Sequence, residues 1–284
     1  MKKIILFSSI VLLFISAVCV QNAGAQIING AYKRQDNYQK KPMPIPMVRE
    51  ADVFWSKMVW RIIDLREKIN QPLYYPTTEV EGLASLSALL LKGIETGQLT
   101  AYDARNDDDF KTPLTMAEVK QAFGAEVRML EVRDFETGEM VMRPVEEEIR
   151  LEQVKQFMIK EEWYFDKQNS RLQVRIVGIC PIQEFFRDDI EDSPLQRRKV
   201  FWIYYPEARE LLSANEVFNP YNDSRRMSYD DLFIKRYFNS YIVQESNVFN
   251  NRLISQYLSG KNAMLESKRI EDNIFNFEQD LWEY

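Results

Sequence analysis

The stretch READVFWSKMVWRIIDLREKIN, residues 49–70, has more apolar side chains than one face of a helix can bury. At about 100° per residue, one stripe about 140° wide collects Phe54, Trp55, Met58, Val59, Ile62, Leu65 and Ile69. Trp60 and Ile63 lie outside this stripe, among polar residues. The segment therefore predicts an amphipathic helix with a second apolar edge, which is covered either by a sheet of its own domain or by another subunit.

Capping and turn residues predict the next helices. Thr78 and Glu81 form a capping box for a helix through residues 83–95, which Gly97 ends. Thr115 and Glu118 cap a short third helix that ends at Gly124. Near the C-terminus, Ser228 and Asp231 begin another helix, and residues 250–277 favour further helix with a break at Gly260.

The middle of the chain has the pattern of antiparallel strands. Residues 126–143 and 163–177 each read as a hairpin with a polar turn, and residues 199–205 form a further strand that Pro206 ends. The predicted fold class is α+β, with mainly helical N- and C-terminal regions around a central antiparallel, hairpin-rich sheet. This domain spans residues 48–284, with divisions considered near residues 125 and 207.

The N-terminus has the pattern of a secretion signal. Lys2 and Lys3 precede the apolar run 4–20, and the small residues 23–25 follow it. We therefore expect a signal peptide at residues 1–25; the alternatives are a membrane anchor and lipid attachment at Cys19. Removing the two lysines changes the formal charge from −6 to −8. Such an acidic chain is not suited to binding nucleic acid.

Residues 26–47 form an extended arm in this interpretation. Pro42, Pro44 and Pro46 alternate with other residues, which forbids a helix and favours a polyproline-like backbone. The arm is either a solvated linker or a segment that lies on a neighbouring subunit, with Tyr32 and Tyr38 as its contacts.

The residues for common catalytic chemistry are missing. The chain has no histidine, which excludes Ser-His-Asp and Cys-His catalysis and histidine-ligated metals. Cys180 would be the one cysteine of the mature chain and reads as a buried thiol. Asp107, Asp109 and Glu118 have partial EF-hand spacing, but Lys111 and Thr112 stand at positions that need a ligand and a glycine. The sequence therefore predicts no enzyme, no cofactor and no metal site.

Three long segments carry a family resemblance: residues 49–76, residues 225–246 and the C-terminal ESKRIEDNIFNFEQDLWEY. Their unusual combinations of aromatic and charged residues resemble the gliding motility protein N family, GldN or PorN. The resemblance implies a periplasmic subunit of the type IX secretion system. It further implies a ring with a GldK/PorK lipoprotein beneath the outer membrane, contact with the motor protein GldM/PorM, and contacts between ring neighbours.

Aromatic residues are the candidates for contacts in such an assembly, because binding energy concentrates on buried aromatic anchors. The candidate interface residues are Trp60, Ile63, Tyr74 and Tyr75. An alternative function is an exported carbohydrate-binding or carbohydrate-active protein that stacks aromatic residues on sugars and uses a carboxylate pair. A chaperone for exported cargo is a further alternative.

Overall fold

The structure is a computed structural model that describes residues 40–80, 82–105, 108–125, 127–133, 140–146, 149–186, 195–222 and 224–281. The chain divides into two compact units, residues 1–37 and 38–284, and all the described residues belong to the second. The expected signal peptide, Tyr32 and Tyr38 lie outside the described residues.

The described part of the chain contains both strands and α-helices. The strands are β1 (Val53–Asp64), β2 (Ala101–Asp103), β3 (Pro113–Leu114), β4 (Val127–Arg133), β5 (Met140–Glu146), β6 (Val154–Asp166), β7 (Arg171–Phe185), β8 (Gln196–Lys199), β9 (Phe201–Tyr204), β10 (Glu216–Val217), β11 (Met227–Ser228) and β12 (Tyr241–Glu245). The α-helices are α2 (Gln71–Tyr74), α3 (Leu86–Glu95), α4 (Met116–Ala122), α5 (Tyr205–Ala214), α6 (Tyr229–Ile234) and α7 (Lys261–Asp280).

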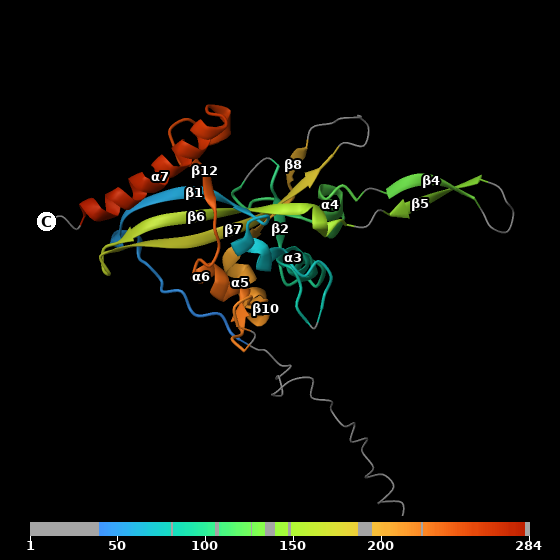
Figure 1. The fold of residues 1–284 in the computed structure, drawn as a ribbon, viewed down its shortest axis with the longest axis horizontal. Helices are drawn as coiled ribbons and strands as arrows, with labels where there is room; N and C mark the ends of the chain where they lie inside the picture. Colours follow the sequence, from blue (N-terminus) through green and yellow to red (C-terminus); the bar gives the residue numbers. More distant parts are fainter. Residues whose placement is uncertain are drawn as a thin grey trace, which may run out of the picture. The chain divides into compact units, whose positions relative to one another are not determined.

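An antiparallel sheet organises the described part of the chain (Figure 1). Its eight strands follow the order β12-β1-β6-β7-β9-β2-β3, and β8 pairs with β7. Strands β6 and β7 form the long central hairpin, and β4 pairs with β5 in a separate ribbon. The α+β class and both predicted hairpins are confirmed.

The helix predicted for residues 49–70 is wrong. Residues 53–64 form β1, which pairs with β6 on one side and with β12 on the other. In a strand, successive side chains point to opposite faces, so Trp60 and Ile63 bury on different sides of the sheet. The apolar residues that formed a second edge on a helix are the second face of a strand. A short 3-10 turn at Lys68–Asn70 and helix α2 follow.

The sheet is apolar on both faces. On one face the strands pack against α3, α4, α5 and α6, and this cluster includes Ile63, Phe157, Ile159, Ile179 and Ile203. On the other face a second cluster contains Trp60, Met158, Cys180, Ile182 and Trp202. Because β1, β6, β7 and β9 each contribute residues to both clusters, these central strands are buried on two sides.

Helix α7 packs along the β12 edge of the sheet (Figure 1). Ile270 and Ile274 of α7 pack with Ile242 of β12 and Val59 of β1. The hydroxyl of Ser267 accepts a hydrogen bond from the backbone N–H of Ile242 at 2.9 Å. The helix therefore covers an edge strand whose free backbone groups would otherwise be open to pairing. Over the described ranges, no helix has the length and apolar character needed to cross a membrane.

Most predicted helix ends are confirmed. Thr115 with Glu118, and Ser228 with Asp231, form complete capping boxes. Gly260 stands directly before α7 with a positive φ of 56°, so it separates this helix from the preceding segment. The predicted start at Thr78 is wrong: helix α3 begins after Ser85, whose hydroxyl accepts from the N–H of Ala88 at 3.3 Å.

Candidate functional site

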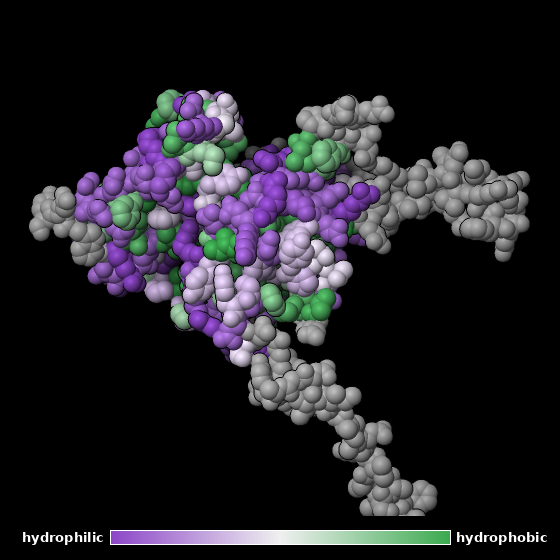
Figure 2. Space-filling view, viewed as in Figure 1, coloured by the Kyte–Doolittle hydropathy of each residue, from purple (hydrophilic) through white to green (hydrophobic). Residues whose placement is uncertain are grey.

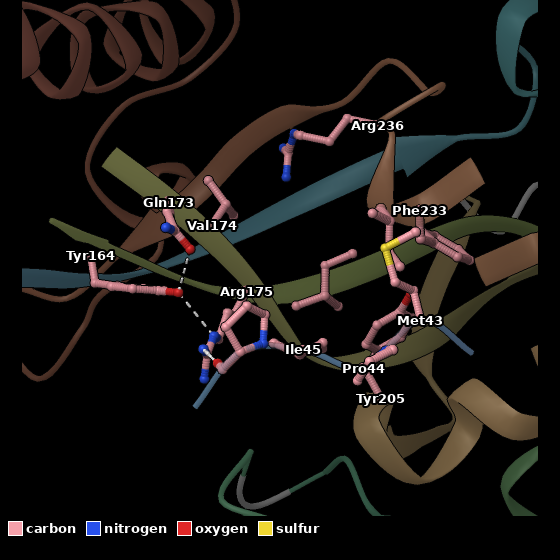
Figure 3. Close-up of a pocket in the computed structure, with 13 residues that line it drawn as sticks. Met43, Pro44, Ile45, Tyr164, Gln173, Val174, Arg175, Tyr205, Phe233 and Arg236 are labelled. Atoms are coloured by element: carbon pink, nitrogen blue, oxygen red, sulfur yellow. Dashed lines mark hydrogen bonds between the residues drawn. The ribbon is translucent and has the colours of Figure 1, made fainter. Parts of the chain in front are cut away.

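A segment that precedes β1 lies on the surface of the folded domain and forms hydrogen bonds with it. Residues 40–47, KKPMPIPM, run across α5, α6 and β7 (Figure 3). We call them the arm segment, and we call the surface below them the arm groove, defined by Arg175, Arg209, Ser213 and Asp231. Residues 40–47 form no helix and no strand, and the extended arm over residues 26–47 stays a prediction from the three prolines.

Three side chains of the groove bind backbone carbonyls of the arm segment. The Ser213 hydroxyl donates to the carbonyl of Lys40 at 3.0 Å, and Arg209 Nη2 donates to the carbonyl of Met43 at 2.6 Å. Arg175 Nη2 donates to the carbonyl of Pro46. The three carbonyls are three residues apart, and a polyproline II helix has three residues per turn. They therefore face the groove from one side of the segment.

Arg209 is held in place by a buried ion pair. Its Nε and Nη2 atoms donate to the two carboxylate oxygens of Asp230, each at 3.0 Å, and the side chains are only 8% and 5% exposed. The Tyr205 hydroxyl donates to the same carboxylate at 2.8 Å. Burial, and then the negative charge of Asp230, raise the pKa of Tyr205, so this hydroxyl keeps its proton. The bidentate geometry fixes the guanidinium whether or not the arm is bound.

The other end of the groove is built around Tyr164 (Figure 3). Arg175 Nε donates to the Tyr164 hydroxyl at 3.0 Å, and that hydroxyl donates to Gln173 Oε1 at 2.9 Å. The guanidinium of Arg175 also lies over the Tyr164 ring, 5.2 Å from its centroid. A cavity of about 220 Å³ lies between this end and the apolar side chains of Ile45 and Phe233.

An ion pair between the arm segment and the groove adds charge complementarity. Lys40 binds Asp231, the residue that also caps α6 through Ser228. Burial acts to raise the pKa of Asp231, but hydrogen bonds from Lys40 and Ser228 outweigh it and hold the pKa below its usual value. The carboxylate is therefore ionised at neutral pH.

A second, larger hollow lies between α7 and the sheet. This α7 groove has a volume of about 780 Å³. Its apolar lining consists of Ile62, Met158, Ile182, Ile242, Val243, Leu253, Ile254, Ala263 and Met264, and Arg197 and Lys199 of β8 also line it. Met264 is 75% exposed. In Figure 2, hydrophobic residues gather near the beginning of α7, whereas most of the visible face is hydrophilic.

The structure separates the four predicted interface residues. Trp60 and Ile63 are buried in the chain's own clusters, 3% and 0% exposed, which corresponds to cover by the chain's own domain. The Tyr74 hydroxyl donates to the carbonyl of Glu152 at 3.1 Å, and its ring packs edge-on to Tyr75 at 4.8 Å. Tyr75 is 54% exposed, so it stays the candidate with a free surface.

The residues singled out for other chemistry have structural contacts. Asp109 forms ion pairs with Lys111 and Lys160, at 2.8 and 3.5 Å, and Glu118 caps α4; Asp107 lies outside the described residues. Cys180 is fully buried, and burial raises the pKa of its thiol to about 12. Its thiol therefore stays protonated and unreactive at neutral pH.

The sequence predicts the arm but carries no signal for the residues that bind it. The alternating prolines predict an extended segment, whereas Arg175, Arg209 and Ser213 lie more than a hundred residues away along the chain. The motif YPEARELLSA places Arg209 and Ser213 one helical turn apart, a spacing that puts both on one side of α5. Nothing in that motif indicates that the two side chains donate hydrogen bonds to backbone carbonyls of another segment.

Together these features define an α+β domain that binds a polypeptide segment and presents an apolar groove beside its C-terminal helix. The chain belongs to the GldN family, gliding motility associated protein GldN, whose model matches residues 48–283. Proteins of this family are associated with gliding motility and type IX secretion. No curated protein matches the chain.

Proposed function

We propose that the chain is a non-enzymatic structural subunit of the type IX secretion and gliding machinery. In this proposal it resides in the periplasm and forms a ring with a GldK/PorK-like lipoprotein beneath the outer membrane. Ring neighbours contact one another, and the subunit links to the periplasmic region of a GldM/PorM-like motor protein. The observation that carries the proposal is the family match over nearly the whole described domain.

The α7 groove supports this role as a contact surface. It is broad and mainly apolar, and its floor is the second face of the sheet, from Ile62 to Ile182. Exposed apolar patches of this kind mark interaction surfaces in soluble proteins. Arg197 and Lys199 add positive charge at β8. Subunits of a large assembly need dry contacts of this type, with polar groups around them.

The test is co-expression of the mature chain with its lipoprotein partner, followed by native mass spectrometry and negative-stain imaging. A stoichiometric, ring-sized particle supports the proposal. A monomer that does not bind the partner contradicts it and favours the carbohydrate-binding alternative. Binding to a glycan array tests that alternative directly.

One substitution tests the α7 groove itself. Met264→Glu places a charge in the groove at a site that is already 75% exposed, so folding should be unaffected. We expect at least a tenfold loss of incorporation into the particle, equivalent to about 1.4 kcal/mol. The control is Val248→Glu, at a position that is 90% exposed and does not line the groove. Equal losses for both variants would exclude the groove as a contact.

A further inference from the structure

The arm groove binds mainly the backbone of its ligand, and the ion pair of Lys40 with Asp231 adds a side-chain contact at one end. Ser213, Arg209 and Arg175 bind carbonyls, while Met43 and Met47 of the arm segment are 70% and 97% exposed. Prolines have no N–H group, so the segment cannot pair as an ordinary strand. Recognition of an extended, proline-containing segment through its preformed backbone is a known mode of peptide binding.

The groove is complete without the arm. Asp230 and Tyr205 hold Arg209 at the middle, and Tyr164 holds Arg175 at the end. These contacts lie within the folded domain and do not involve residues 40–47. A groove that is organised in advance binds a segment from any source at little cost in side-chain ordering.

The residues that connect the arm segment to the sheet have few contacts with the rest of the described domain. Asp52 is anchored by the β6–β7 turn, where Lys167 N–H donates to its carbonyl at 2.9 Å and Gln168 donates to its carboxylate at 2.7 Å. Residues 47–51 between the two anchors are largely exposed and, within the described part of the chain, make no hydrogen bond to the rest of the domain. The anchor at Asp52 can therefore stay in place while the arm segment leaves its own groove.

We propose that the arm segment passes from one copy of the chain to the groove of the next copy. This inference rests on the proposed function, because the ring supplies neighbours at a high local concentration. When two copies exchange identical arm segments, each arm makes the same contacts in the neighbour's groove as in its own. The free energies of the two arrangements therefore differ mainly through the effective concentration of each groove near the arm. In a ring, the neighbour's groove competes on equal terms with the chain's own groove. The arms would then connect each subunit to the next.

The test uses the ion pair of Lys40 and Asp231, which a zero-length carbodiimide converts to an amide bond. Full-length mature chains labelled with ¹⁴N and ¹⁵N are mixed in equal amounts in denaturant and refolded together. They are then cross-linked at high concentration, alone and with the lipoprotein partner. In mass spectrometry of the Lys40–Asp231 product, cross-links within one copy always carry one isotope, whereas about half of the cross-links between copies carry both. The matched control is Lys57–Glu245, a 2.6 Å pair between β1 and β12.

Arm exchange predicts that about half of the Lys40–Asp231 product carries both isotopes if every arm passes to another copy, and about a quarter if own and neighbouring grooves are used equally. The Lys57–Glu245 product should carry one isotope. A single-isotope Lys40–Asp231 product in both samples overturns the proposal. If a ring-sized particle forms and the product is unmixed, arm exchange fails and the ring assignment stands. If mixed product forms without the lipoprotein partner bound, arm exchange stands and the ring assignment loses support.

Discussion

At the scale of single residues, Gly178 of β7 decides how closely Phe110 approaches the sheet. A Cβ at this position would collide with the Phe110 ring, 2.8 Å from its Cε1 atom, and would lie 3.1 Å from the Ile203 carbonyl oxygen. The ring uses this space to pack edge-on against Tyr102 and Trp202. The absent side chain is therefore part of the aromatic packing on the second face of the sheet.

Gly178→Ala should lower the free energy of unfolding by about 1–3 kcal/mol, because overpacking forces the Phe110 ring or the backbone to move. Urea denaturation measures the loss. The double variant Gly178→Ala with Phe110→Leu separates the cause, since a smaller side chain at 110 relieves the collision. If the alanine costs as much in the Phe110→Leu background as in the parent, the collision is not the reason.

Asp64 makes the stability depend on pH. Burial acts to raise the pKa of this carboxyl, but hydrogen bonds from the Arg66 side chain and N–H, and from Gln156, outweigh it and lower the pKa to about 2. A folded pKa below the unfolded value stabilises the protein above pH 4, and this contribution is lost as the pH falls toward 2.

We expect Asp64→Asn to be roughly 1–2 kcal/mol less stable at pH 7, a figure reduced because the Arg66 side chain is half exposed. The gap to the parent should close as the pH falls from 5 toward 2. Urea unfolding at several pH values gives both curves. A gap that stays constant with pH would show that the loss comes from packing and not from the charge.

At the scale of elements, β1 shows what the sequence could and could not predict. A strand in the middle of a sheet that is covered on both faces has no polar side, so its apolar residues do not alternate cleanly with polar ones. Most apolar residues of the segment 53–64 consequently also fit one stripe of a helix, whereas Trp60 and Ile63 lie outside that stripe. A strand places them on its two faces and accounts for both.

Local signals predicted the elements that depend on few neighbours. The capping boxes at Thr115 and Ser228 need only residues within one turn. The β6–β7 hairpin has a polar turn, and apolar and polar residues alternate over residues 172–176. The arm groove has no such local signal, because its donors come from α5 and β7 while its ligand precedes β1. Only the folded sheet brings them together.

The place of β1 in the core makes a direct prediction for Trp60. Trp60→Ala should cost about 3–5 kcal/mol in unfolding free energy, because it empties a site that is 3% exposed beside Met158 and Lys160. Tyr75→Ala, at a residue that is 54% exposed, should change stability by less than about 0.5 kcal/mol. Denaturant unfolding of both variants measures these changes in the free energy of unfolding. A stable Trp60→Ala protein would contradict this burial and favour the interface interpretation of Trp60.

At the scale of the whole described domain, stability is unevenly distributed. The β6–β7 hairpin lies between β1 and β9 and contributes to the packing on both faces of the sheet. Helix α7 is attached through a small apolar cluster, stacking of Phe277 on Trp55 at 4.7 Å, and an ion pair of Arg61 with Glu271 at 3.1 Å. The Ser267 hydroxyl and the Glu278 carboxylate also accept hydrogen bonds from the N–H groups of Ile242 and Leu172. Elements with fewer buried contacts open at lower free energy than the core does. The α7 groove therefore lies beside the part of the domain that opens more easily.

Ser267→Ala tests this distribution. It leaves the buried N–H of Ile242 without its acceptor, which should lower the opening free energy of α7 and β12 by about 1–2 kcal/mol. Hydrogen exchange with mass spectrometry should show five- to thirtyfold faster exchange in these two elements and unchanged exchange in β6 and β7. Ser255→Ala is the matched control, since Ser255 lines the same groove but is exposed. Faster exchange throughout the sheet would mean that α7 and the sheet unfold as one unit, and that a partner in the α7 groove would stabilise the entire domain instead of its edge.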